Sequence, residues 1–147
     1  YNMNMRTLFI YLFLMITVVC NAQTAVSINQ LNGTSWIRTS PVDKEMVVKY
    51  CFNNSSYTNS AEYISVGKAV SIFKYYLSPT VPAAFDFSKV GTKTSGKYMI
   101  GYNSKMKKMF YYEITSFDSK KMVLLRKGKP FSIGGAKDLY LTYQRIK

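Results

Sequence analysis

The sequence predicts an all-β domain, an antiparallel up-and-down β-barrel of about eight strands. Three observations predict it. Short runs of residues alternate apolar with polar side chains, polar or glycine-containing turns separate these runs, and no segment has the apolar spacing of an amphipathic helix. Tyrosine, which favours strands, occurs thirteen times. Eight or nine short strands joined in this way fit a barrel, and a β-sandwich is the alternative.

The first 22 residues have the pattern of a secretory signal peptide. Arg6 gives a basic start, an apolar run extends from Leu8 to Val19, and Cys20 and Ala22 place small residues before a cleavage site. We therefore expect residues 1–22 to be removed and residues 23–147 to form one exported barrel domain, periplasmic or secreted. A lipoprotein anchored through Cys20 and an uncleaved membrane anchor are alternatives.

The first elements follow directly. Residues 27–31 suit a single helical turn that plugs one end of the barrel, here called the base. A strand is expected at 36–39. It should end at Ser40-Pro41, because proline cannot donate a hydrogen bond to a sheet. Residues 45–52 alternate as a half-buried strand. Cys51 lies in this strand and is expected to be a small buried hydrophobe, with no disulfide partner once Cys20 has left with the leader.

The middle of the chain is less regular. Residues 53–56 predict a polar turn, and residues 61–66 and 69–77 predict a hairpin around Gly67-Lys68. Residues 78–90 contain Pro79 and Pro82, so we expect a loop there, placed as a flap over the open end of the barrel, here called the mouth. Residues 91–96 predict a further turn.

The C-terminal half predicts strands at 97–102, 107–117, 120–126 and 139–145, with a glycine-rich loop at 128–136. Aromatic residues on the faces expected to point inward could line a cavity and grip an amphipathic ligand. They are Tyr50, Tyr98, Phe110, Tyr112 and Tyr143. The alternative is that these side chains simply fill the core.

The two ends of the expected domain resemble small bacterial lipocalin-like domains. Residues 31–36, Leu-Asn-Gly-Thr-Ser-Trp, are similar to the family's entry motif, and residues 120–125 and 139–145 are similar to its closing strand pair. The resemblance implies that Gly33 precedes the first strand, that Trp36 packs across the base, and that Arg145 lies over the indole as a cation–π pair. A barrel of this size can also hold one small ligand.

The charge is strongly basic, with a formal net charge of +13, and only Arg6 of the basic residues lies in the leader. Eleven basic residues fall between Lys89 and Lys129, where Glu113 and Asp118 are the only acids. This excess favours anionic partners such as a membrane surface or an acidic polysaccharide, and export makes nucleic acid an unlikely one. A solvated surface with no partner is the alternative. The expected basic surface consists of Lys105, Lys107, Lys108, Lys120 and Lys121.

Several common catalytic patterns are missing, although Cys51 or a Ser-Lys pair leaves hydrolysis as an alternative. The chain has no histidine, its seven acids are scattered, and it has no phosphate-binding glycine loop. We therefore expect no enzyme activity, no cofactor and no metal. The leading expectation is a secreted protein that binds a small hydrophobic or amphipathic ligand. The alternatives are a basic module that docks on an anionic envelope polymer or membrane, and a structural or inhibitory partner of another secreted protein.

Overall fold

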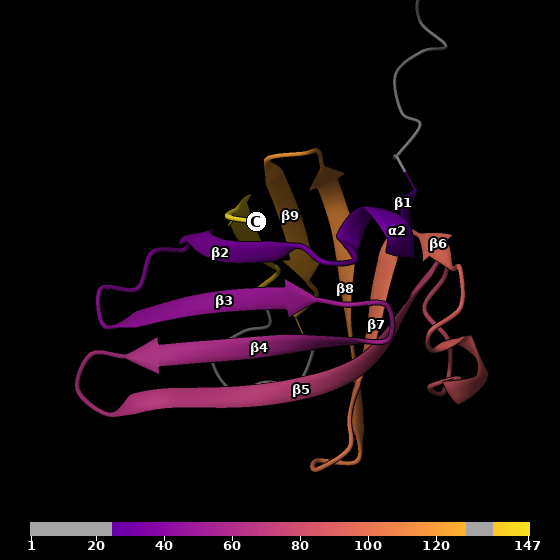
Figure 1. Cartoon of the computed structure of the whole chain (residues 1–147), viewed down its shortest axis with the longest axis horizontal. Coiled ribbons are helices and arrows are strands. Elements are labelled where there is room, and N and C mark those ends of the chain that lie inside the picture. The colour runs from indigo at the N-terminus through magenta and orange to yellow at the C-terminus, as the bar shows by residue number, and fades with distance from the viewer. Residues whose placement is uncertain (1–24, 129–136) are drawn as a thin grey trace, which may run out of the picture.

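The computed structural model describes residues 25–128 and 137–147, so the expected leader and most of the 128–136 loop lie outside the described residues. Eight strands form a closed antiparallel barrel in the order β10-β2-β3-β4-β5-β7-β8-β9 (Figure 1). This confirms the predicted barrel and excludes the sandwich. The strands are β2 (Ser35–Ser40), β3 (Met46–Phe52), β4 (Ser56–Tyr63), β5 (Gly67–Ser78), β7 (Tyr98–Asn103), β8 (Lys108–Phe117), β9 (Lys121–Arg126) and β10 (Leu139–Arg145).

The base of the barrel is plugged as the sequence predicts. One helical turn, α2 (Ile28–Leu31), buries both of its apolar side chains, Ile28 and Leu31. Before it, β1 (Val26–Ser27) pairs with β6 (Ser95–Gly96) in a separate two-stranded sheet. Among the described residues, no helix has the length and apolar character that a membrane crossing requires.

The chain enters the barrel through a tight turn at Gly33. Its φ of 74° is in the left-handed region, which glycine adopts without the steric cost of a side chain. Its amide donates a hydrogen bond to the carbonyl of Phe52, 3.0 Å away. The turn therefore fastens the plug to the end of β3 and starts β2 in register with it.

The first and last strands of the barrel are neighbours. β10 pairs with β2, and Trp36 lies opposite Arg145. The centre of the guanidinium lies 6.0 Å from the centre of the Trp36 ring. Both the closure and the contact confirm the sequence prediction. β2 ends at Ser40, directly before Pro41, because proline brings no N–H to continue the ladder.

Alternation and pairing decide which side chains face inward. Residues directly opposite each other on antiparallel strands point to the same side of the sheet. The inward faces predicted for β3, β8 and β10 are confirmed, since they contribute Val48, Tyr50, Phe52, Ile114, Leu141 and Tyr143 to the buried core. Trp36, Tyr57, Tyr75 and Met122 belong to the same core.

The expected hairpin at 61–77 is displaced along the chain. β4 begins at Ser56 and ends at Tyr63, the turn covers 64–66, and Gly67 already pairs with Tyr63. The sequence prediction missed the first half of β4, where residues 56–60 are mostly polar and Asn59 is a weak strand former. Pairing with β3 along its whole length, from Phe52 opposite Tyr57 to Met46 opposite Tyr63, overrides that preference.

The segment from Pro79 to Thr94 covers the outer wall and does not cover the mouth, so the predicted flap is wrong. Phe85 packs on Tyr76 and Tyr102, with ring centres 5.1 and 5.2 Å apart. Both tyrosines point away from the barrel interior, because their neighbours Tyr75 and Gly101 point into it. A short 3₁₀ turn, η1 (Phe87–Lys89), lies in this segment.

Cys51 is exposed, not buried as expected. It lies on the outer face of β3, opposite Ser35, whose hydroxyl donates to the sulfur at 3.4 Å. The inner face at this point is taken by its neighbours Tyr50 and Phe52. The strand was identified correctly, but a cysteine in an alternating strand can belong to either face.

Candidate functional site

The two ends of the barrel differ in how far solvent reaches the inner wall. At the base, Trp36, Met99 and Met122 have no exposed surface. Toward the mouth, inward-facing residues are half-buried. These are Arg38, Met46, Asn59, Ala61, Phe110, Tyr112 and Leu139. Among the described residues, solvent therefore reaches the inner wall farther toward the mouth than at the base.

Four of the five predicted lining residues face the interior. Tyr50 and Tyr143 are 2% and 1% exposed, and their rings stack with centres 4.9 Å apart. Phe110 and Tyr112 lie nearer the mouth and are half-buried. Tyr50 and Tyr143 thus form part of a floor, and Phe110 and Tyr112 form part of the wall above it. Whether they contact a ligand stays a prediction.

Tyr98 is the exception, because it faces outward. It lies opposite Ser78 and Glu113, and the Nζ of Lys97 lies 5.1 Å from the centre of its ring. The prediction that Tyr98, Ile100 and Tyr102 form the inner face of β7 is wrong. In a strand, an error of one residue exchanges the inner and outer faces. The inner face carries Met99 and Gly101 instead, because the ring of Tyr57 fills the space above Gly101.

The floor of the barrel is a packed aromatic cluster. Tyr57 stacks on Phe73 with ring centres 4.8 Å apart, and it also contacts Tyr50 and Phe52 at 5.4 and 5.6 Å. Burial raises the pKa of the Tyr50 and Tyr57 hydroxyls well above the usual value, since the interior disfavours a phenolate. In this lower half the aromatic residues fill the core, the alternative that the sequence left open.

Polar groups lie above this floor, on the inner wall. The side-chain oxygen of Asn59 is buried and has no hydrogen-bond partner. Tyr50 and Tyr143, whose rings are stacked, carry their hydroxyl groups on this inner wall. Burial raises the pKa of Tyr143 to about 12, while the positive charges of Arg38 and Arg126 act in the opposite direction. The floor is therefore apolar, and its upper rim is polar and positively charged.

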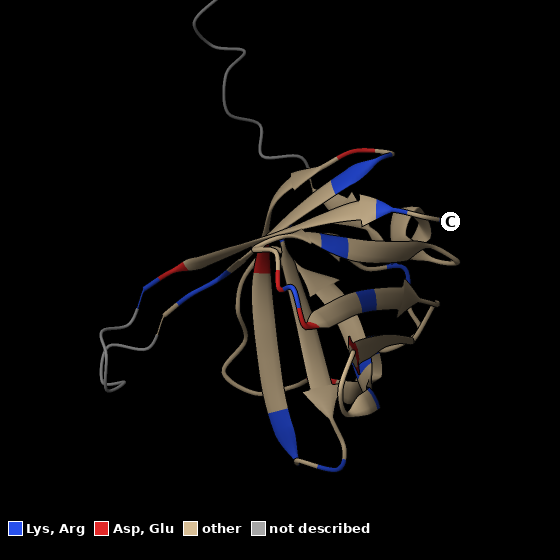
Figure 2. Ribbon diagram, turned by 90° about the vertical axis from the view of Figure 1, so that its left-hand side faces the viewer, with Lys and Arg blue, Asp and Glu red and all other residues tan. Residues whose placement is uncertain are grey.

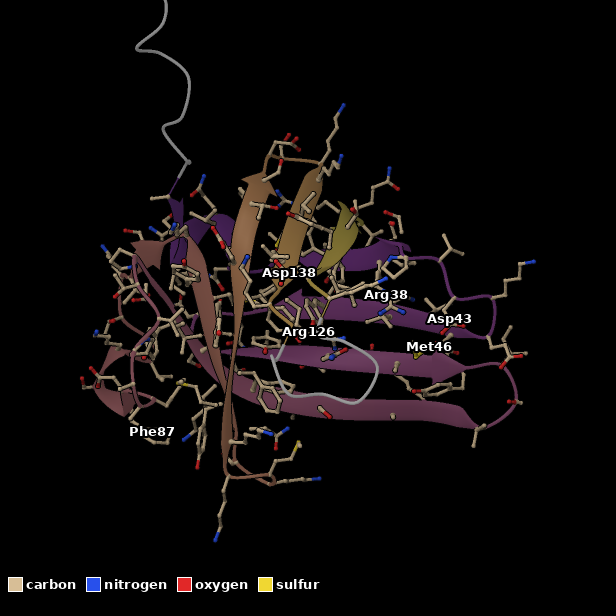
Figure 3. All side chains as sticks on the ribbon, turned by 180° about the vertical axis from the view of Figure 1, so that it is seen from behind. Arg38, Asp43, Met46, Phe87, Arg126 and Asp138 are labelled. Atoms are coloured by element: carbon tan, nitrogen blue, oxygen red, sulfur yellow. The ribbon has the colours of Figure 1, made fainter. Side chains whose placement is uncertain are left out.

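Two arginines of this rim were not anticipated from the sequence. Arg38 faces inward, because it lies opposite Tyr143 on the neighbouring strand. Arg126 faces inward, because it lies opposite Leu139, which packs against the core. Figure 3 shows both residues on the mouth side of the barrel. Their spacing of two from the inward residues Trp36 and Leu124 was the signal that could have found them.

The five lysines expected to form one basic surface lie at two ends of the molecule. Lys105, Lys107 and Lys108 surround the turn between β7 and β8, and Lys120 and Lys121 surround the turn between β8 and β9 (Figure 1). β8 separates the two groups by ten residues, or about 30 Å. Figure 2 likewise shows the basic residues spread over several elements. The expectation of a single surface is therefore wrong.

A shallow hollow of about 350 Å³ lies at the base, outside the sealed core. Its lining includes Asn29, Thr34, Asp118 and Arg145. Two backbone amides, those of Lys120 and Lys121, donate to the Asp118 carboxylate at 2.7 Å and hold its pKa below the usual value. The carboxylate is thus already engaged in shaping the β8–β9 turn.

The described residues contain no group of three or more histidine, cysteine or acidic side chains that could hold a metal ion. The salt bridges there join Lys89 with Asp86, Lys97 with Glu113, and Lys127 with Asp138. All three pairs lie outside the barrel interior, which leaves the two rim arginines as the charges nearest to the floor.

Comparison with known proteins gives no relative to set beside this geometry. No protein-family model, no curated protein and no solved structure matches the chain. What is established is the architecture, a closed barrel of eight antiparallel strands.

Proposed function

We propose that the protein binds a small hydrophobic or amphipathic ligand in the mouth of the barrel, without catalysis, as a lipocalin-like protein. The observation that carries this proposal is the contrast between a sealed base and an inner wall that stays half exposed toward the mouth. Barrels of about eight strands are wide enough to hold one small ligand.

The composition of the open wall supports an amphipathic ligand. Met46, Ala61, Phe110 and Leu139 offer an apolar surface that packs against the core. Asn59 offers a buried oxygen without a partner, and an unsatisfied buried acceptor costs about 1–3 kcal/mol. A ligand with an apolar body and a hydrogen-bond donor would cover the apolar wall and donate to the oxygen of Asn59.

We propose export as the setting of this function. The leader-like pattern of residues 1–22 supports it, with cleavage ahead of Gln23 and a final location in the periplasm or outside the cell. The intact mass of the protein recovered from an exporting cell tests the cleavage site. A lipid attached to Cys20 would instead indicate the lipoprotein alternative.

Docking on an anionic polymer or membrane through one basic surface is less well supported. It needs the five lysines together, and β8 holds them apart. Each group alone offers two or three exposed charges, which salt screens readily. The barrel mouth, in contrast, brings its wall and floor together in one place.

The test is the binding of an uncharged fluorescent probe, Nile red, to two matched variants. Ala61→Trp places a large ring on the inner wall, and Ser60→Trp places the same ring on the outer face of the same strand. We expect saturable binding to the native chain and to Ser60→Trp, and loss of binding in Ala61→Trp. Equal binding to both variants, or none to the native chain, would rule the proposal out.

A further inference from the structure

We propose that the ligand of this barrel is an anionic amphiphile, whose acidic head group is held by Arg38 and Arg126 and whose apolar tail lies along the half-exposed inner wall. This inference rests on the proposed function and specifies its ligand class. A carboxylate is the simplest head group of this kind, because the planar guanidinium matches it with two parallel hydrogen bonds.

The first step is the position of the two arginines. They come from β2 and β9, the strands on either side of β10, and both face inward. Arg38 lies opposite Tyr143, so its side chain extends from a position close to the aromatic floor. The side chain of Arg126 extends from a position nearer the mouth, opposite Leu139. An arginine side chain is long, so the guanidinium groups of both residues can reach one bound anion from two sides.

The second step is the absence of a counter-charge. All seven acidic residues of the chain belong to the described part. Glu62 and Glu113 point outward from β4 and β8, because their neighbours in each strand point inward. The other acids lie in turns and loops, at Asp43, Glu45, Asp86, Asp118 and Asp138. Among the described residues, neither rim arginine forms an ion pair.

The third step is the cost of this arrangement. Arg38 is half-buried, and a charge that leaves water without a partner loses solvation. Arg126 is exposed and keeps its hydration, but two like charges on the inner face of the same end of the barrel also repel each other. A bound anion removes both penalties, because it supplies the partner that the chain itself lacks. Lys108, also inward-facing by register, is exposed at the rim and adds a third positive charge.

The fourth step is the wall beside the arginines. Met46 and Ala61 lie opposite Tyr63 and Val48 on adjoining strands and share the inner face with Leu139. These side chains are half-buried and pack against the core, so they present apolar surface where a head group would enter. An inorganic anion would leave that surface in contact with water, whereas an aliphatic tail would cover it.

The experiment compares decanoate with decanol, two ligands of equal length that differ in charge, as competitors of Nile red at neutral pH. Native protein should bind decanoate about tenfold more tightly than decanol, the effect of one charge-assisted contact. The double variant Arg38→Gln, Arg126→Gln should bind both equally. Lys49→Gln with Lys68→Gln removes the same charge from the outer face and should keep the native preference.

The outcomes separate the two proposals. Equal binding of acid and alcohol to the native protein, or a preference that survives in the arginine double variant, would overturn the anionic head group while leaving ligand binding intact. If neither compound displaces bound Nile red, the anionic head group is overturned while ligand binding stands; if Nile red itself does not bind to the native chain, both proposals are overturned. Retained decanol binding in the arginine variant shows that its barrel is still folded.

Discussion

The guanidinium of Arg145 lies 6.0 Å from the centre of the Trp36 ring, across the pairing of the first and last barrel strands. The indole has no exposed surface, and its N–H donates to the hydroxyl of Thr34 at 2.7 Å. The arginine is exposed and also donates from Nε to the carbonyl of Lys147. The pair thus forms a lid, with a buried ring beneath and a solvated charge above.

Replacing Arg145 with alanine should lower the free energy of unfolding by about 0.5–1 kcal/mol, the range for a cation–π contact at an exposed site. The emission of Trp36, the single tryptophan, should change as well, because its upper edge then meets water. Urea unfolding followed by fluorescence measures both effects. Gln144→Ala, a change at the exposed neighbour, should have neither; equal effects in the two variants would contradict the contact.

Gly101→Ala should destabilise the barrel by about 1–3 kcal/mol, the usual cost of overpacking a core. A Cβ at Gly101 would lie 2.6 Å from the hydroxyl oxygen of Tyr57, whose ring is held by its stacking on Phe73. Tyr57→Phe removes this oxygen, so the double variant should recover part of the loss. Chemical denaturation of the two single variants and the double variant measures the coupling. Strictly additive losses would show that the contact is not the cause.

The barrel should lose stability as the pH rises above about 10. Burial raises the pKa of Tyr50, Tyr57, Tyr75 and Tyr143 above the value in an unfolded chain. A raised folded pKa means that the stabilisation is complete below about pH 10, the ordinary tyrosine pKa, and is lost as the pH climbs toward the folded values. Urea midpoints at a series of pH values measure the decline.

Matched variants identify the tyrosines responsible for that decline. Tyr143→Phe removes one buried hydroxyl and should make the fall in stability with pH less steep. Tyr111→Phe, on the outer face of β8, removes a more exposed hydroxyl and should leave the slope unchanged. An identical slope in both variants would indicate that other groups, such as the lysines, control the alkaline transition.

The two lysine groups should act separately on the binding of an anionic amphiphile. Lys105, Lys107 and Lys108 lie at the mouth end, so their replacement with glutamine should slow association at low salt. Replacement of Lys120 and Lys121, about 30 Å away at the base, should not. Stopped-flow mixing with decanoate at two ionic strengths makes the comparison. Equal slowing by both variants would point to the overall charge of the chain.

The sequence predicted those strands in which the alternation of apolar and polar residues agrees with the turn or proline residues at the strand ends. β3 alternates without interruption, β2 stops at a proline, and the tryptophan and arginine at the two ends met as expected. Where local preference and pairing disagree, the prediction was wrong. Residues 57–60 were not predicted as a strand, but a complete ladder with β3 makes them part of β4.

The site was harder to predict than the fold, for a physical reason. Alternation says that two faces exist, and only packing decides which one is inside. On β7 the larger side chains, Tyr98 and Tyr102, face outward, because Tyr57 occupies the space above Gly101. Arg38 on β2 and Arg126 on β9 would be expected to face solvent from their charge alone. Only the pairing of these strands with β10 shows that both face inward. Single-strand patterns contain no information about such cross-barrel contacts.

The adjacency of β2 and β10 also sets an order of events in folding. Hairpins such as β4–β5 and β7–β8 join residues that are close in sequence, so they can form early. The β2–β10 seam joins residues roughly a hundred positions apart, and its closure carries the largest loop entropy. A nascent chain therefore remains an open sheet until its last strand is available. Burial of Trp36 beneath Arg145 would mark the moment at which the barrel closes.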